Sequence, residues 1–424
     1  TGACWHPSKR GYPKIGNLHY MQILTQRYSQ KRFNLLFFIM LYATNFCGFA
    51  PIADLYPKGN MTYELPLLAL MIYCGTKIKE RNEYKKWMFL LFITLIFNYF
   101  STMTFEGRGF VNAMRTSSFI NYLFVFFPIM VIRPTILEVE KVIKYLGILC
   151  LMLYFTQQIL LPTPIVESLT SGWRKANDAG IFDIKRYTIT GEIIMFLFQL
   201  IAINKYFLTK NKKELLYVLL VFTMCILHGY RSIILAMLVS IIYIYHKIKG
   251  IKLNTQTISF VILFILAYYI ISLTPFVQDI LGTIAEKNEK QFSNSSNNWL
   301  EIDRIIELDF FINQQLQSPL EWIFGCGFLS KEEYKNAGLI PDFINWVDLG
   351  FIGLSFMGGI LLTFCWLRLL LLNMRKVNIR YAYLAAFSVF VITSTLTLPI
   401  AFNDRAPAIQ ALAFYIGFLI FKQK

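Results

Sequence analysis

Long apolar segments that alternate with short polar connections make up most of this sequence. Segments of this kind run over residues 33–50, 64–76, 87–99, 118–132, 142–161, 190–207, 215–227, 232–245, 257–273, 349–373, 381–400 and 406–421. Several of them are shorter than the roughly 20 residues that a straight helix needs to cross a bilayer. The pattern predicts an all-α polytopic membrane protein of about twelve transmembrane helices, the first nine within residues 33–276 and the last three within residues 349–421.

One polar stretch, residues 277–348, is far longer than the other connections and is expected to form a large external (periplasmic) loop. Apolar residues recur at roughly helical spacing over 299–316, which predicts a short amphipathic helix that lies on the membrane or caps a cavity. Gly325-Cys326-Gly327 predicts a turn whose backbone approaches another element closely. Glycines that permit close helix packing or the approach of a bulky lipid follow at Gly350, Gly353, Gly358 and Gly359.

The composition agrees with this picture. Of the 424 residues, 56% are hydrophobic and 17% are aromatic, and the mean hydropathy is +0.50. A soluble protein of this size cannot bury so much apolar surface. The formal net charge of +16 does not indicate nucleic-acid binding, because that function needs a basic face on a soluble domain.

The placement of the basic residues predicts the orientation of the chain. Lysines and arginines gather in the connections 77–86, 205–213, 247–252 and 375–380. With about twelve helices these connections lie on the same side as both termini, and the positive-inside rule makes that side cytoplasmic. Residues 1–32 are then a basic cytoplasmic segment, of which 1–20 have no apolar run and are set aside as a mis-called start.

Arginines nevertheless recur in the connections that are expected to be external. An arginine at a membrane boundary is costly, and its planar fork suits bidentate binding of phosphate oxygens. The candidates for binding a phosphorylated substrate are Arg231, Arg304, Arg186 and Arg405, with Arg231 first because it lies in an almost loop-free turn. The alternative interpretation is that these arginines snorkel or set the topology. Three others, Arg108, Arg115 and Arg174, are interpreted as solvated loop charges.

Two aspartates are candidates for catalysis. Asp348 stands where the long loop becomes an apolar helix, so it is expected to cap that helix, to act as a general base, or both. Asp342 is the second candidate, and Asp404 is interpreted as the ion-pair partner of Arg405. The four histidines are dispersed and the carboxylates form no clustered set, so no metal site or cofactor is expected.

Several short patterns carry a resemblance to a known family. They are the Tyr230-Arg231-Ser232 turn that opens an apolar helix, Asp303-Arg304 and the run 319–328 in one large loop near the C-terminus, and the acidic and glycine pattern of 348–360. In these features, and over residues 33–421, the chain resembles the O-antigen and capsular polysaccharide polymerase family, whose relatives include O-antigen ligases.

The resemblance implies a GT-C-like membrane glycosyltransferase of the bacterial inner membrane. Such an enzyme joins undecaprenyl-pyrophosphate-linked oligosaccharide repeat units into O-antigen or capsular polysaccharide at the outer face, without metal. Arg231 and Arg304 would bind the pyrophosphate. The expected partners are the lipid-linked oligosaccharide, the bilayer, a chain-length regulator and a flippase.

Two other functions remain open. An O-antigen ligase is the first, but its branch of the family typically has a histidine at the end of the large loop, and residues 338–350 contain none. A flippase or transporter for lipid-linked oligosaccharides is the second. Transporters often show internal repeats, and the sequence shows no repeat.

Overall fold

The computed structural model describes residues 29–49, 61–107, 109–159, 165, 189–228, 231–250, 303–328, 346–375, 377–396, 400–402 and 405–422. Within these residues the regular elements are helices and none is a strand, which confirms the all-α class. Each apolar segment predicted within the described residues forms a helix. The predicted segment 257–273 lies outside them.

The first group of helices comprises α2 (Gln30–Ala43), η1 (Asn45–Gly48), α4 (Met61–Lys77), α5 (Glu83–Phe105), α6 (Phe110–Thr116), α7 (Ser118–Asn121), η2 (Tyr122–Val125), α8 (Phe126–Ile132) and α9 (Ile136–Ile159). The second group comprises α10 (Ile193–Thr209), α11 (Lys212–His228), α12 (Arg231–Lys249), α15 (Asp303–Phe310), η5 (Phe311–Gln315), α16 (Pro319–Phe324), η6 (Trp346–Leu349), α18 (Phe351–Met374), η7 (Ile379–Tyr381), α19 (Ala382–Thr395), η8 (Ile400–Phe402) and α20 (Ala406–Lys422).

Three of the described helices, in α5, α12 and α18, are long and apolar enough to cross a membrane. A fourth candidate is the pair formed by α6 and the helical stretch 118–132, which is bent by 69°. Large apolar side chains point outward from several helices, for example Phe38 at 64% and Met152 at 62% exposure. These apolar helices indicate a membrane protein. The count of about twelve spans and the large external loop remain predictions.

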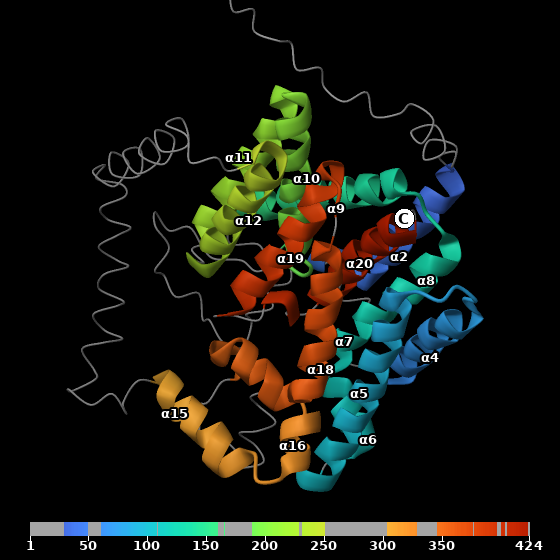
Figure 1. The fold of residues 1–424 in the computed structure, drawn as a ribbon, viewed down its shortest axis with the longest axis vertical. Coiled ribbons are helices and arrows are strands. Elements are labelled where there is room, and N and C mark those ends of the chain that lie inside the picture. The colour runs from blue at the N-terminus through green and yellow to red at the C-terminus, as the bar shows by residue number, and fades with distance from the viewer. Residues whose placement is uncertain are drawn as a thin grey trace, which may run out of the picture.

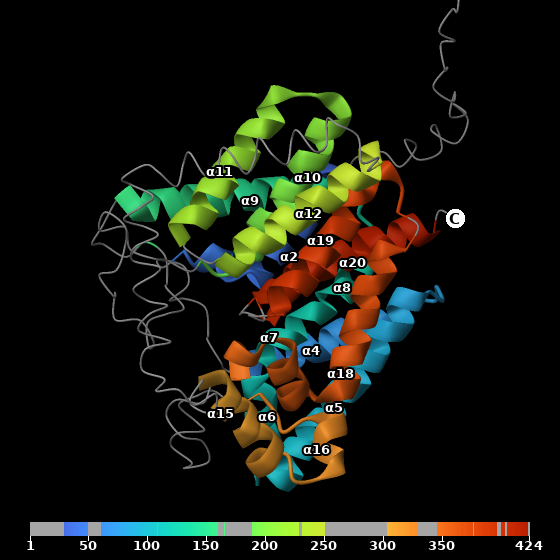
Figure 2. The ribbon, with the colours of Figure 1, turned by 60° about the vertical axis from the view of Figure 1, so that its left-hand side comes forward.

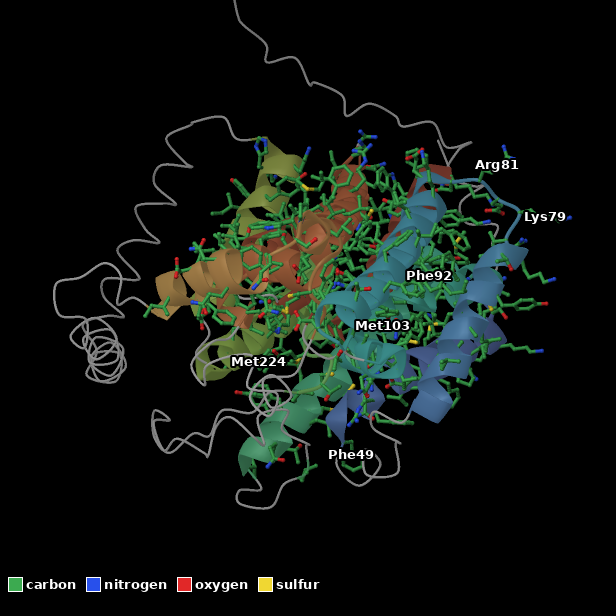
Figure 3. All side chains as sticks on the ribbon, turned by 90° about the horizontal axis from the view of Figure 1, so that it is seen from below. Phe49, Lys79, Arg81, Phe92, Met103 and Met224 are labelled. Atoms are coloured by element: carbon green, nitrogen blue, oxygen red, sulfur yellow. The ribbon has the colours of Figure 1, made fainter. Side chains whose placement is uncertain are left out.

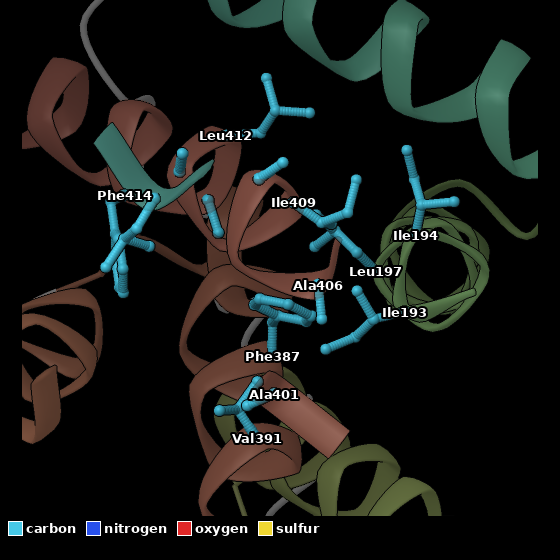
Figure 4. Packing of buried hydrophobic residues seen from close by; sticks show 14 of the residues in the cluster. Ile193, Ile194, Leu197, Phe387, Val391, Ala401, Ala406, Ile409, Leu412 and Phe414 are labelled. Atoms are coloured by element: carbon cyan, nitrogen blue, oxygen red, sulfur yellow. The ribbon is translucent and has the colours of Figure 1, made fainter. Parts of the chain in front are cut away.

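The centre of the molecule is formed by α10, α19 and α20 (Figures 1 and 2). These helices are apolar around their whole circumference, and such helices are stable only when other elements cover every face. Their packing is shown in Figure 4, where Ile193 and Leu197 of α10 face Phe387 of α19 and Ile409 of α20. The remaining helices surround this core.

The sequence predicts one continuous helix over residues 349–373, whereas the helix α18 is broken. It breaks at Gly359, where φ is 82° and ψ is 155°, a conformation open essentially to glycine alone. A break of this kind frees backbone carbonyl groups of the preceding turn, and these need other donors. The donors come from a distant part of the chain, as described below.

Ion pairs link two of the basic connections to other helices at one end of the helices. Lys422 Nζ lies 2.7 Å from Glu80, Lys205 Nζ lies 2.8 Å from Glu140, and Tyr383 donates to Glu140 over 2.9 Å. Lys79 and Arg81 lie at this end of α5, and Met103 lies at its other end (Figure 3).

Candidate functional site

The helix α16 forms at the far end of the molecule from α11 (Figure 1). Its first turn is stabilised by a complete capping box. The Ser318 side chain accepts a hydrogen bond from a backbone N–H of the first turn, and the Ser318 N–H donates a hydrogen bond to the Glu321 carboxylate over 2.8 Å. Pro319 at the first position is already suited to a helical φ. The helix ends at Gly325, which leads into the predicted glycine turn.

This turn inserts into the break of α18. The N–H of Cys326 donates to the carbonyl oxygen of Phe356 over 3.0 Å, and the N–H of Gly327 donates to that of Met357 over 2.9 Å. A Cβ atom at Gly325 would collide with the backbone of α18, so only glycine fits there. The predicted close approach of the Gly325–Gly327 turn is therefore confirmed.

Side chains of α5 hold this junction from a third side. Asn98 donates to the carbonyl oxygens of Phe324, over 2.6 Å, and Met357, over 2.8 Å. Ser101 donates to the carbonyl oxygen of Gly325 over 2.7 Å. Each of these bonds satisfies a buried carbonyl group that would otherwise cost free energy, so α5, α16 and α18 form one rigid unit.

A series of aromatic contacts connects this unit to α7, η6 and η8. The ring of Phe328 lies 5.7 Å from that of Trp346 and 5.3 Å from that of Phe119. Phe119 lies 6.5 Å from Phe402, which lies 4.7 Å from Trp366. The segment after α16, η6, α7 and η8, which are far apart in the sequence, therefore meet.

Arg405 lies next to this aromatic series and is buried, with 8% of its surface exposed. Its guanidinium group lies 3.8 Å from the centre of the Tyr122 ring, which is a cation–π contact. The carboxyl group of Glu64, on α4, lies near Ser118 and within electrostatic reach of Arg405 and Arg115. A charged cluster thus lies partly buried between α4, α6, the stretch 118–122 and the start of α20, and we call these five residues the Arg405 cluster.

Three other predicted site residues are described by their backbone. Arg231 is the first residue of α12, Arg304 lies in α15, and Asp348 lies in η6. The helix α15 contacts η6, so the elements that carry Arg304 and Asp348 are neighbours. Asp342, Arg186 and Asp404 lie outside the described residues.

The expectation that Asp348 caps the next helix is wrong. The N-cap of α18 is Gly350, which has no side chain, whereas Asp348 lies within the preceding 3₁₀ turn. Gly350 is placed there by its positive φ of 57° and by its close approach to the carbonyl oxygens of Thr395 and Leu396. Asp348 is therefore separated from the first residue of α18 by the end of the 3₁₀ turn and by Gly350.

Sequence reasoning missed two buried carboxylates at the ends of apolar segments, Glu64 and Glu192. Glu64 belongs to the Arg405 cluster, and Glu192 precedes α10, within electrostatic reach of Cys150 and Cys225. The available signal was an ionisable residue at the edge of an apolar run, which is a candidate for function by position alone. Among the described residues no group of three or more His, Cys, Asp or Glu side chains could hold a metal ion.

Comparison of the chain with models of known protein families finds no match, and comparison with curated proteins finds no similar sequence. The resemblance to the polysaccharide polymerases therefore rests on the short patterns described above.

Proposed function

We propose that this protein is a membrane polymerase that joins polyprenyl-pyrophosphate-linked oligosaccharide repeat units into a polysaccharide at the outer face of the bacterial inner membrane. The observation that carries the proposal is the Arg405 cluster. It holds one of the arginines predicted to bind pyrophosphate, and Phe119, the neighbour of Ser118 in the sequence, contacts Phe328 of the large loop. The sequence resemblance supplies the substrate class.

The reaction follows from this arrangement. Guanidinium groups stabilise the negative charge that develops on the leaving lipid pyrophosphate, and a surrounding of low polarity strengthens that effect. A carboxylate orients the acceptor hydroxyl for attack on the anomeric carbon of the donor sugar. Outward-facing apolar side chains of the helices provide a path for the polyprenyl chains.

The test is chain extension by the purified protein with synthetic polyprenyl-pyrophosphate repeat units, in the presence of a chelator. We expect a ladder of products that grow by one repeat unit. Transfer of a single finished glycan to another acceptor would indicate a ligase. Movement of the substrate across vesicles without a new glycosidic bond would indicate a flippase.

The same assay tests the two arginines that the family resemblance selects. Arg231→Ala and Arg304→Ala should each abolish polymer while leaving the protein level and single lipid-linked units unchanged. Lysine at either position should restore little polymer synthesis, because it keeps the positive charge but lacks the planar guanidinium group that binds two phosphate oxygens at once. Polymer of full length from both alanine variants would contradict their binding of pyrophosphate.

The predicted orientation is tested by labelling single cysteines in a cysteine-free background. A cysteine placed within residues 210–213 should react only after the membrane is permeabilised, because this basic connection is expected to be cytoplasmic. A cysteine placed within residues 293–298 should react in intact spheroplasts. Labelling of both positions from the same side would contradict the predicted topology and, with it, the proposed site of reaction.

A further inference from the structure

Glu64 is one of the buried carboxylates of the described residues. Only 8% of its surface is exposed, and it lies near the start of α4, an apolar helix. Ser118 lies near its carboxylate, while the buried Oε2 atom accepts no hydrogen bond from the described residues. A buried acceptor of this kind is costly and rare in native proteins, and a catalytic role is one of its established explanations.

The relation of Glu64 to Arg405 is also unusual. Within the described part of the chain, the direct ion pairs of carboxylates are Arg32–Glu138, Lys205–Glu140 and Lys422–Glu80, and Glu64 is in none of them. Arg405 therefore acts on Glu64 through space, and its guanidinium group is held on the ring of Tyr122. A carboxylate whose role is to neutralise a buried arginine would instead be expected to form a bidentate pair with it.

The cluster also has an exposed side. Arg115, on α6, is solvent-exposed, while Ser118 is partly buried and Tyr122 is buried. Arg405 and Arg115 contribute two positive charges and Glu64 contributes at most one negative charge, so these three groups have a net positive charge that favours an anionic substrate. The cluster thus combines an anion-binding side with one carboxylate oxygen that can accept a proton.

We propose that Glu64 is the carboxylate that binds and deprotonates the acceptor hydroxyl, while Arg405 binds the pyrophosphate of the donor. This inference rests on the proposed polymerase function. The acceptor oxygen forms a bond to the anomeric carbon, and the bond from that carbon to the phosphate oxygen breaks. The electron pair of that bond remains on the lipid pyrophosphate, and the proton of the hydroxyl moves to Glu64 Oε2 and then to water.

The absence of a direct ion pair between Glu64 and Arg405 among the described residues is compatible with this step. In an inverting displacement the attacking hydroxyl and the leaving group lie on opposite sides of the anomeric carbon, so the base and the pyrophosphate site must be near each other without touching. Asp348, the candidate that the sequence predicts, lies on η6, and Glu64 takes the role of base in its place. Asp348→Asn should consequently retain most of the extension rate.

The decisive variant is Glu64→Gln, because glutamine has nearly the same shape as glutamate but cannot accept the proton. Chain extension should fall at least about 100-fold, the usual contribution of a general base. Binding of the lipid-linked donor should change by less than about threefold, since Arg405 is retained. The residual rate should no longer fall with decreasing pH, as it does when a base is protonated.

The matched control is Glu80→Gln, which removes a carboxylate from the opposite end of the helices, where Glu80 pairs with Lys422. Its extension rate should equal that of the unmodified protein. A purely structural role for Glu64 predicts a different result: the double variant Glu64→Gln/Arg405→Gln, in which both charges are removed, would recover stability and activity together. That recovery would overturn the proposal.

The assay also separates this inference from the function on which it rests. If the unmodified protein does not extend the chain, the polymerase function itself is wrong. If the unmodified protein extends the chain and Glu64→Gln does so at a near-normal rate with an unchanged pH profile, only the role of Glu64 is wrong.

Discussion

Gly359→Ala should lower the free energy of unfolding by about 3 kcal/mol, because it combines a glycine-only backbone conformation with a collision in a packed junction. A Cβ atom at this position would meet the carbonyl oxygen of Ile323 and the backbone of Phe324. The α16 segment would then leave the break of α18, and the hydrogen bonds of Cys326 and Gly327 would be lost with it. Chemical unfolding of the purified protein in detergent measures the loss.

Gly107→Ala is the matched control for this prediction. Gly107 also has a positive φ, of 64°, but a Cβ atom there meets nothing within 4 Å. Its replacement should therefore cost only the backbone contribution, about 1–2 kcal/mol. Equal losses in the two variants would show that the collision at the α16–α18 junction contributes nothing.

The helices were predictable from the sequence because their signal is local. Apolar runs predicted α4, α10 and α20 to within a few residues, and helical spacing within the long loop predicted α15. The break at Gly359 was not predictable. It is stabilised by donors from the Gly325–Gly327 turn and by Asn98 of α5, and a pairing between segments so far apart leaves no trace in the local pattern.

The candidate site was predictable in part for a related reason. Arg405 could be selected because a charge at a membrane boundary is unusual in any fold. Its partners could not be selected, because Tyr122 and Ser118 look like ordinary interfacial residues until the fold places Tyr122 against Arg405 and Ser118 near Glu64. The capping role expected for Asp348 was wrong since Gly350 takes the N-cap position, and the close approach to Thr395 requires a glycine there.

Arg405→Lys should reduce chain extension about 100-fold or more while leaving the protein folded. Lysine keeps the positive charge beside Glu64, so no buried carboxylate is left uncompensated. It cannot present two parallel donors to a pyrophosphate, and its ammonium group does not stack on Tyr122 as the planar guanidinium group does. Loss of one fixed donor to a developing negative charge typically costs this much in rate. The extension rate and the unfolding temperature are measured on the same preparation.

Arg380→Lys provides the matched control, because the guanidinium group of Arg380 also lies over a tyrosine ring, that of Tyr381, at 5.5 Å, but at the basic end of the molecule. Both variants should fold, and only Arg405→Lys should lose extension. The loss should appear mainly in kcat, since the arginine acts most strongly on the charge that develops as the glycosyl–phosphate bond breaks. A normal rate in Arg405→Lys would mean that a positive charge in the cluster is sufficient. Arg405 would then serve to balance Glu64, and pyrophosphate binding would fall to Arg231 and Arg304.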